Sequence, residues 1–303
     1  MTEHLADAGR EISLAYEEFG DAGAEPLLLV AGLGQQLHSW PTAFCERLAE
    51  RGYRVVRFDN RDVGRSTHIR FRPPGPAAMI TRRWDPRQYD LTDLATDTTG
   101  LLDALGYDDA HLVGVSMGGM IAQTVAALAP RRVRTLTSIM SMTGARGVGR
   151  PALSTWRRMA GPRPTTREAA IESAVRMFRH IGSHGHPFDE AWVRELAGLG
   201  WDRDPSREGT PRQLAAILRS GDRTAQLRAV TAPTLVIHGD RDRMVHPTGG
   251  AATARAIAGA RLETVRGMGH DLPKGAWPVL LDLIDGHARG AGTARSTDAS
   301  TTS

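Results

Sequence analysis

The sequence predicts an α/β fold in which helices flank a mostly parallel sheet. Short strand-like runs alternate along the chain with segments whose apolar residues recur at helical spacing. The first of these runs lacks the alternation of a half-exposed strand, which indicates a strand buried on both faces. At 303 residues, the chain is long enough for one large domain, or for a core domain with a smaller insert.

The first half of the predicted core alternates between strand and helix. The run at 26–30 is apolar throughout, as a strand buried on both faces should be. A helical stretch at 44–51 and a strand at 53–58 follow it. Residues 91–105 carry leucines at helical spacing and end at Gly106, a natural C-cap.

The second half of the core repeats this order. A strand at 111–115 leads into a helix at 118–129, which Pro130 stops. Another strand follows at 133–139. After a long interruption, the remaining predicted elements are two strands and a final helix, at 234–237, 261–265 and 276–287.

The interruption spans residues 144–228 and contains amphipathic helical pieces, aromatic residues and loop signals, without a clear buried strand. An insert of this size between two strands indicates a helical cap, placed after the sixth strand of the sheet. We therefore expect a core of residues 1–143 and 229–288. Residues 289–303 are rich in Gly, Ala, Ser and Thr and show no apolar pattern, so we expect a disordered tail.

Composition excludes several classes of protein. No run of about 18 apolar residues is present, so we expect no membrane span. The polar, acidic segment 1–10 does not resemble a signal peptide, and a cytoplasmic monomer or homodimer is expected. Cys45 is the only cysteine and is expected to be a buried, inert thiol. The net charge is +4, and basic residues alternate with acidic ones, so no nucleic-acid partner is predicted.

A candidate nucleophile lies between the strand at 111–115 and the helix that follows it. Gly114-Val-Ser-Met-Gly118 matches the G-x-S-x-G pattern of a nucleophile elbow. The pattern alone is weak, but a tight turn from strand to helix would expose the Ser116 hydroxyl above the sheet. The small neighbours allow strand and helix to approach each other closely.

A serine hydroxyl needs a base, so the elbow predicts an acid and then a histidine later in the chain. His270 is the one histidine of eleven that follows a strand end in this order, in a Gly-rich loop. The strand at 234–237 is followed by a turn that carries Asp240 and Asp242. Asp240 could stabilise that turn as an Asx residue. Asp242 lies further out, where the chain can bend toward His270, so loop geometry favours it without excluding Asp240.

Acyl transfer also requires hydrogen-bond donors for the developing oxyanion. One donor should be the backbone N–H of Met117, directly after the nucleophile. The other should come from the loop that follows the first buried strand, where Leu33 is the candidate. These motifs require no metal and no organic cofactor.

Taken together, the motifs resemble the α/β-hydrolase superfamily over residues 12–287. They are the Gly32-Leu33-Gly34 loop, the run Phe58–Ser66, the elbow at Ser116, His238–Asp242 and Gly267–His270. The resemblance implies that Asp242 is the acid and that the Phe58–Ser66 run is a structural turn without chemistry. Three segments look most like the aclacinomycin methylesterase group, which cleaves a methyl ester on an aromatic polyketide: Ser39–Pro41, Asp59–Ser66 and Gly267–Pro273.

We therefore expect a serine hydrolase that cleaves a carboxylic ester of a small to medium hydrophobic substrate. A C–C bond hydrolase, lactonase or perhydrolase with the same triad is an alternative, as is a non-catalytic ligand-binding protein on the same scaffold. Apolar residues of the cap could line a substrate pocket, although buried aromatic residues more often pack in a core. These residues are Trp156, Met159, Met177, Phe178, Trp192 and Trp201.

Overall fold

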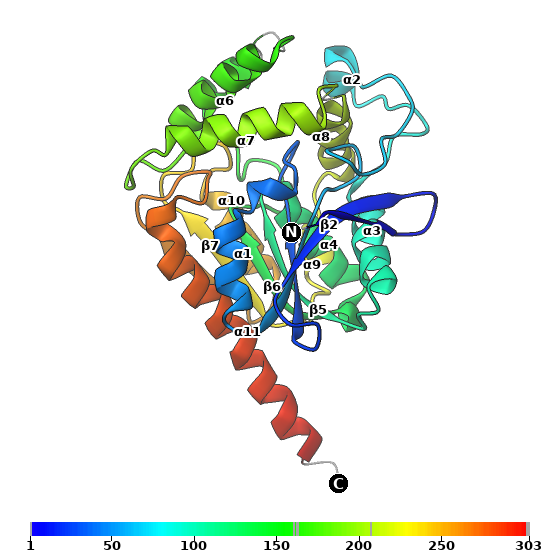
Figure 1. Cartoon of the computed structure of the whole chain (residues 1–303), viewed down its shortest axis with the longest axis vertical. Helices are drawn as coiled ribbons and strands as arrows, with labels where there is room; N and C mark the ends of the chain where they lie inside the picture. The colour runs from blue at the N-terminus through cyan, green and yellow to red at the C-terminus, as the bar shows by residue number, and fades with distance from the viewer. Residues whose placement is uncertain (1, 160, 162–163, 207, 301–303) are drawn as a thin grey trace.

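A sheet of eight strands forms the centre of the protein, with helices on both of its faces (Figure 1). The computed structural model describes residues 2–159, 161, 164–206 and 208–300. The strand order is β1-β2-β4-β3-β5-β6-β7-β8. The strands are β1 (His4–Asp7), β2 (Ser13–Phe19), β3 (Glu25–Val30), β4 (Tyr53–Phe58), β5 (Ala110–Val115), β6 (Val133–Ile139), β7 (Thr234–Gly239) and β8 (Arg261–Val265).

The six strands from β3 to β8 run parallel to their neighbours, while β1 and β2 add an antiparallel hairpin at the β4 edge. The predicted fold class is confirmed, and the six predicted strands correspond to β3–β8. The helices are α1 (Thr42–Ala49), α2 (Pro76–Thr81), α3 (Leu91–Ala104), α4 (Met117–Leu128), α5 (Leu153–Met159), α6 (Arg167–Ile181), α7 (Glu190–Arg203), α8 (Gly209–Ser220), α9 (Thr224–Leu227), α10 (Thr248–Ala256) and α11 (Trp277–Ser300), with short 3-10 helices η1 (Leu37–Ser39), η2 (Pro130–Arg132) and η3 (Lys274–Ala276).

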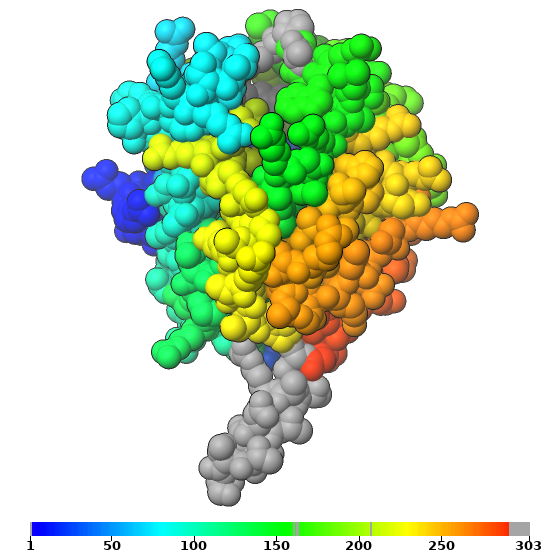
Figure 2. All heavy atoms as spheres, turned by 180° about the vertical axis from the view of Figure 1, so that it is seen from behind, coloured from blue at the N-terminus to red at the C-terminus, as the bar shows by residue number. Residues whose placement is uncertain are grey.

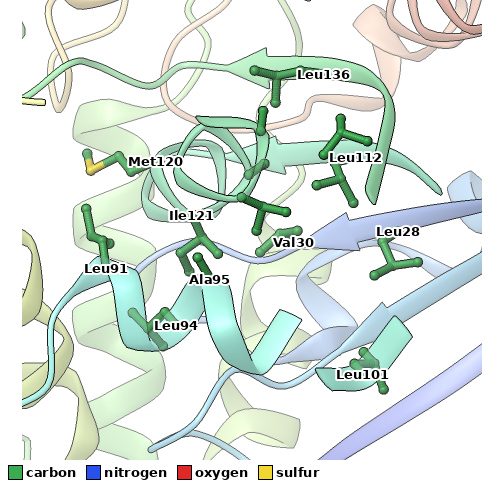
Figure 3. Close-up of a cluster of buried hydrophobic side chains, with 14 of the residues drawn as sticks. Leu28, Val30, Leu91, Leu94, Ala95, Leu101, Leu112, Met120, Ile121 and Leu136 are labelled. Atoms are coloured by element: carbon green, nitrogen blue, oxygen red, sulfur yellow. The ribbon is translucent and has the colours of Figure 1, made fainter. Parts of the chain in front are cut away.

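Two separate apolar clusters cover the two faces of the sheet, because successive side chains of a strand point in opposite directions. Leu28 of β3 belongs to the cluster that contains Leu94 of α3 and Ile121 of α4 (Figure 3). Leu27, its neighbour in the chain, lies on the other face in a cluster formed with α1 and α11. Burial on both faces explains why residues 26–30 of β3 are uniformly apolar in sequence.

Helices α5 to α8 lie between β6 and β7, in the segment predicted to be a cap. Figure 1 shows α6 and α7 side by side, above the end of the sheet to which the elbow points. Seen from behind, the green residues of this segment lie between the cyan residues around α2 and the gold residues after β7 (Figure 2). The exact division into a core and a cap, at residues 144 and 228, stays a prediction.

The turn that follows β4 anchors this helical segment on the core. Asp59, fully buried, accepts a hydrogen bond from Nη2 of Arg203 at the end of α7, at 2.8 Å. Asp62, also fully buried, is paired with both Nε and Nη2 of Arg212 on α8, at 2.9 and 2.8 Å. The run Phe58–Ser66, interpreted above as a structural turn, thus supplies buried partners for two cap helices.

Helix α11 continues to Ser300, into the segment 289–303 for which disorder was expected. The disordered tail stays a prediction. Residues 301–303 of the predicted tail lie outside the described residues. Among the residues that the structure describes, no helix has both the length and the apolar character of a membrane span.

Candidate active site

Ser116 stands at the junction of β5 and α4 with φ +54° and ψ −118°, a conformation that residues other than glycine rarely adopt. Its N–H donates to the carbonyl of Ile139 on the neighbouring strand, at 2.9 Å. A Cβ at Gly114 would overlap the Gly118 carbonyl, and one at Gly118 would overlap the Val30 carbonyl. The glycines of the motif therefore allow the close approach that holds the serine in this strained turn.

The structure brings Ser116, His270 and Asp242 together from three different loops. Nε2 of His270 lies 3.0 Å from Oγ of Ser116, and Nδ1 lies 2.7 Å from Oδ2 of Asp242. Because the carboxylate accepts the Nδ1 proton, Nε2 is left to accept the serine proton. Asp242 follows β7 and His270 follows β8, as the sequence order predicts.

Asp242 is held as an ionised acceptor. Its Oδ1 accepts the N–H groups of Met244 and Val245, each at 2.8 Å, and its side chain is fully buried. Burial alone would raise the pKa of Asp242, but the charge of His270 and hydrogen bonds from His238 and His270 lower the pKa below its usual value. The carboxylate is thus suited to stabilise a protonated His270.

His238 is a second histidine on the same carboxylate, and the sequence analysis gave it no role of its own. Its Nε2 lies 3.4 Å from Oδ2 of Asp242 and donates to the Val245 carbonyl at 2.8 Å. A Cβ at Gly250 would come within 2.5 Å of its Nδ1, so α10 confines the ring. In the sequence, the signal for this contact was the four-residue spacing between His238 and Asp242.

Asp240, the alternative acid, has a different set of contacts. Its Oδ1 accepts the N–H of Gly267 at 2.6 Å, and Arg241 lies 3.8 Å from its Oδ2. Asp240 thereby ties the turn after β7 to the loop that carries His270. This bond joins two loops, whereas the Asx interpretation of Asp240 concerned a bond within its own turn.

The loop after β3 lies beside the nucleophile. A Cβ at Gly32 would be 3.4 Å from the Ser116 Cβ, so Gly32 is a direct neighbour of the serine. Leu33 is the next residue in the chain. Gly34, at φ +65°, donates its N–H to Oε1 of Gln213 on α8, at 2.8 Å. Met117 is the first residue of α4, and the backbone N–H groups of the first helical turn have no acceptor within the helix. The assignment of Leu33 and Met117 as oxyanion donors stays a prediction.

Two of the six cap residues line a cavity of about 70 Å³ next to this loop. Phe178 of α6 and Trp201 of α7 face it together with His38. Trp156 instead has a relative exposure of 51%, and the other three are half-buried outside this cavity: Met159, Met177 and Trp192.

His38, four residues after Gly34, also lines this cavity, and sequence reasoning did not single it out. Its Nδ1 is buried and has no hydrogen-bond partner among the residues described. Burial, and then the charges of Arg57 and Arg203, lower the pKa of His38 below its usual value. Across the described parts of the chain, no group of three or more His, Cys, Asp and Glu side chains could hold a metal ion.

Comparison with known proteins decides the family. The sequence model described as "alpha/beta hydrolase fold" matches residues 25–273. The chain belongs to the alpha/beta hydrolase fold family. This membership confirms the resemblance inferred from the motifs.

Three of the relatives of this alpha/beta hydrolase are similar over nearly their whole length. Rhodomycin D methylesterase DauP of Streptomyces sp. (strain C5) is 32% identical over 307 residues, covering 93% of this chain and 96% of the relative. Rhodomycin D methylesterase DnrP of Streptomyces peucetius is 32% identical over 308 residues, with the same coverage of 93% and 96%. The crystal structure of a hydrolase from Pseudomonas aeruginosa PA01 has a TM-score of 0.70 at 28% identity, covering 96% of this chain and 98% of that one.

Proposed function

We propose that the protein is a serine hydrolase that cleaves a carboxylic ester, with Ser116, His270 and Asp242 as its catalytic triad. The observation that carries the proposal is the hydrogen-bonded chain from Asp242 through His270 to the serine hydroxyl, at 2.7 and 3.0 Å. The strained backbone of Ser116 and its place before a helix support the same role.

In the proposed cycle, Nε2 of His270 takes the hydroxyl proton as Oγ of Ser116 attacks the ester carbonyl. The backbone N–H groups of Leu33 and Met117 would bind the oxyanion. His270 then protonates the leaving alcohol, and an acyl-enzyme remains. A water molecule, deprotonated by His270, attacks this acyl group, releases the carboxylic acid and restores the serine. Asp242 keeps the histidine in the required tautomer throughout.

For the substrate, we propose a methyl ester of a small to medium hydrophobic compound of the aromatic polyketide type. Two curated relatives are named for methyl ester cleavage in rhodomycin D. The apolar side chains of Phe178 and Trp201 beside the Leu33 loop suit such a compound. We also propose that the cap, residues 144–228, selects the substrate.

The proposal extends to the setting of the enzyme: a monomer or homodimer in the cytoplasm that acts on a small molecule rather than on nucleic acid or membrane. The buried free thiol of Cys45 suits a reducing compartment.

Substitution Ser116→Ala tests the nucleophile. Because the serine oxygen forms the acyl bond, we expect ester turnover to fall on the order of a thousandfold or more. We also expect a fluorophosphonate to add one covalent mass to the wild type and none to this variant. Ser173→Ala, at a half-buried serine on α6, is the matched control and should behave like the wild type. Full turnover by Ser116→Ala would remove Ser116 from the mechanism.

Product analysis tests the reaction. Incubation with rhodomycin D should release methanol and the free carboxylic acid, detected by mass spectrometry. Cleavage of a C–C bond in a β-diketone, without ester turnover, would replace the esterase proposal by the hydrolase alternative with the same triad.

A further inference from the structure

The loop that carries His270 is in direct contact with the segment that follows α6 in the cap. The N–H of His270 donates to the carbonyl of Ile181, the last residue of α6, at 2.8 Å. Further along, the N–H of Gly185 donates to the carbonyl of Gly267 at 2.9 Å. We call the two segments the histidine loop (267–271) and the cap strap (181–185).

Glycines let the two backbones come this close. A Cβ at Gly269 would overlap the backbone of Gly182, and one at Gly185 would lie 2.5 Å from the Cα of Gly267. Any side chain at these positions would push the cap strap and the histidine loop apart.

One serine and one aspartate complete the contact. Oγ of Ser183 accepts the N–H of Gly269 at 2.9 Å and donates to Oδ1 of Asp271 at 2.5 Å. The same Oδ1 also accepts the N–H of Ser183 at 2.9 Å. Burial raises the pKa of Asp271, and the hydrogen bonds from Ser183 oppose that rise. A buried network of this kind fixes geometry, because each lost partner leaves a polar group unsatisfied.

The core and the cap share the start of the histidine loop, and the cap strap binds the rest. The turn after β7 binds the first two residues: Asp240 accepts the Gly267 N–H, and Arg241 donates its N–H to the Met268 carbonyl at 3.0 Å. The N–H groups of Gly269 and His270 and the carboxylate of Asp271 all bond to the cap strap. The backbone on either side of the reactive imidazole is therefore positioned by the cap.

We propose that Ser183 and Asp271 are positioning residues that hold His270 in line with Ser116 only while the cap is seated on the core. The inference rests on the proposed function, since it concerns the base of that triad. Its consequence is that the cap controls the catalytic step itself, and not only the binding of the substrate.

The test is Ser183→Ala assayed with p-nitrophenyl acetate, whose small acyl group needs little of the cap for binding. Loss of the hydroxyl leaves the Gly269 N–H unpaired and frees the loop. We expect kcat to fall about 10- to 100-fold, since a shift of about 1 Å in a reacting group costs that much. KM should change little. Ser173→Ala on α6 is the matched control.

Two further pairs of variants protect the test against a folding defect. Gly185→Ala adds one methyl group between the segments and should lower kcat in the same way, whereas Gly75→Ala adds it in open space and should not. Asp271→Asn keeps the acceptor oxygen, so it should retain most of the activity that Asp271→Ala loses. Circular dichroism and the rate of fluorophosphonate labelling of Ser116 accompany each assay.

Each outcome decides the proposal. Wild-type kcat in Ser183→Ala or in Gly185→Ala would overturn it, and so would a loss confined to KM. Equal losses in Asp271→Asn and Asp271→Ala would show that the carboxylate charge acts, rather than the hydrogen-bonded geometry. If wild-type protein were neither active nor labelled by the phosphonate, the proposed function would fail instead.

Discussion

The ion pair between Asp62 and Arg212 provides a direct test of how the cap is attached. Arg212 has an exposed side-chain fraction of 2%, and Asp62 is fully buried. Besides its two bonds to the carboxylate, Arg212 donates Nη1 to the Phe71 carbonyl at 3.0 Å. Substitution Arg212→Met keeps most of the apolar stem but removes every one of these donors.

The expected cost follows from burial. Removing one partner of a buried pair leaves an uncompensated charge, which typically destabilises a protein by about 3–5 kcal/mol. Arg167 and Asp202 form a matched pair in the cap with the same two-bond geometry, at 2.9 and 3.0 Å. Their side chains are 44% and 53% exposed, so Arg167→Met should cost about 0–1 kcal/mol.

Urea unfolding followed by circular dichroism would measure both free energies of unfolding. The double variant Asp62→Asn/Arg212→Met should recover part of the loss, because the buried charge is then gone. If Arg212→Met and Arg167→Met differed by less than about 1 kcal/mol, the pair would not anchor the cap as argued.

Asp242→Asn should lower kcat on the order of ten-thousand-fold, because an amide cannot hold the required tautomer of the histidine. Asp240→Asn should change kcat little, since its amide oxygen can still accept the Gly267 N–H; steady-state kinetics of both variants checks this. Cys45 should react with a thiol reagent only in denaturant, because burial raises the pKa of its thiol to about 12. As pH rises from about 9 toward 12, the unfolded thiol ionises and the folded one does not, so stability should fall by up to about 1.4 kcal/mol per pH unit. In urea unfolding at several pH values, Cys45→Ala should lose this part of the slope.

Strands that sequence analysis found bury apolar side chains, whereas β2, which it missed, buries a charged one. β3 to β7 bury mostly apolar side chains, so their sequences show it, whereas the edge strand β8 buries only Val265. β2 contains Glu17, which is buried because Arg57 on β4 pairs with it at 2.5 Å. A partner 40 residues away in the chain makes that acidic residue a core residue, and no local pattern reveals this.

The same limit applies to the cap. Met177 and Phe178 are adjacent on α6, yet Phe178 lines the cavity beside the Leu33 loop and Met177 does not. Neighbouring residues of a helix point about 100° apart, so the rotation of the helix on its support decides which one faces the site. The triad, by contrast, could be predicted because parallel strands end at one edge of the sheet, and each triad residue follows a strand end.

Two of the places where the cap is attached to the core constrain how the cap can vary. Arg203 and Arg212 bind carboxylates of the turn after β4, while Ser183 binds the loop of the catalytic base. Under the proposed function, a substitution at Phe178 should change the substrate without touching either attachment, since this side chain faces the cavity. A change in residues 181–185 would instead alter the position of His270 for every substrate. Substrate preference and catalytic rate should therefore respond to different cap residues, although both sets lie in the same helical segment.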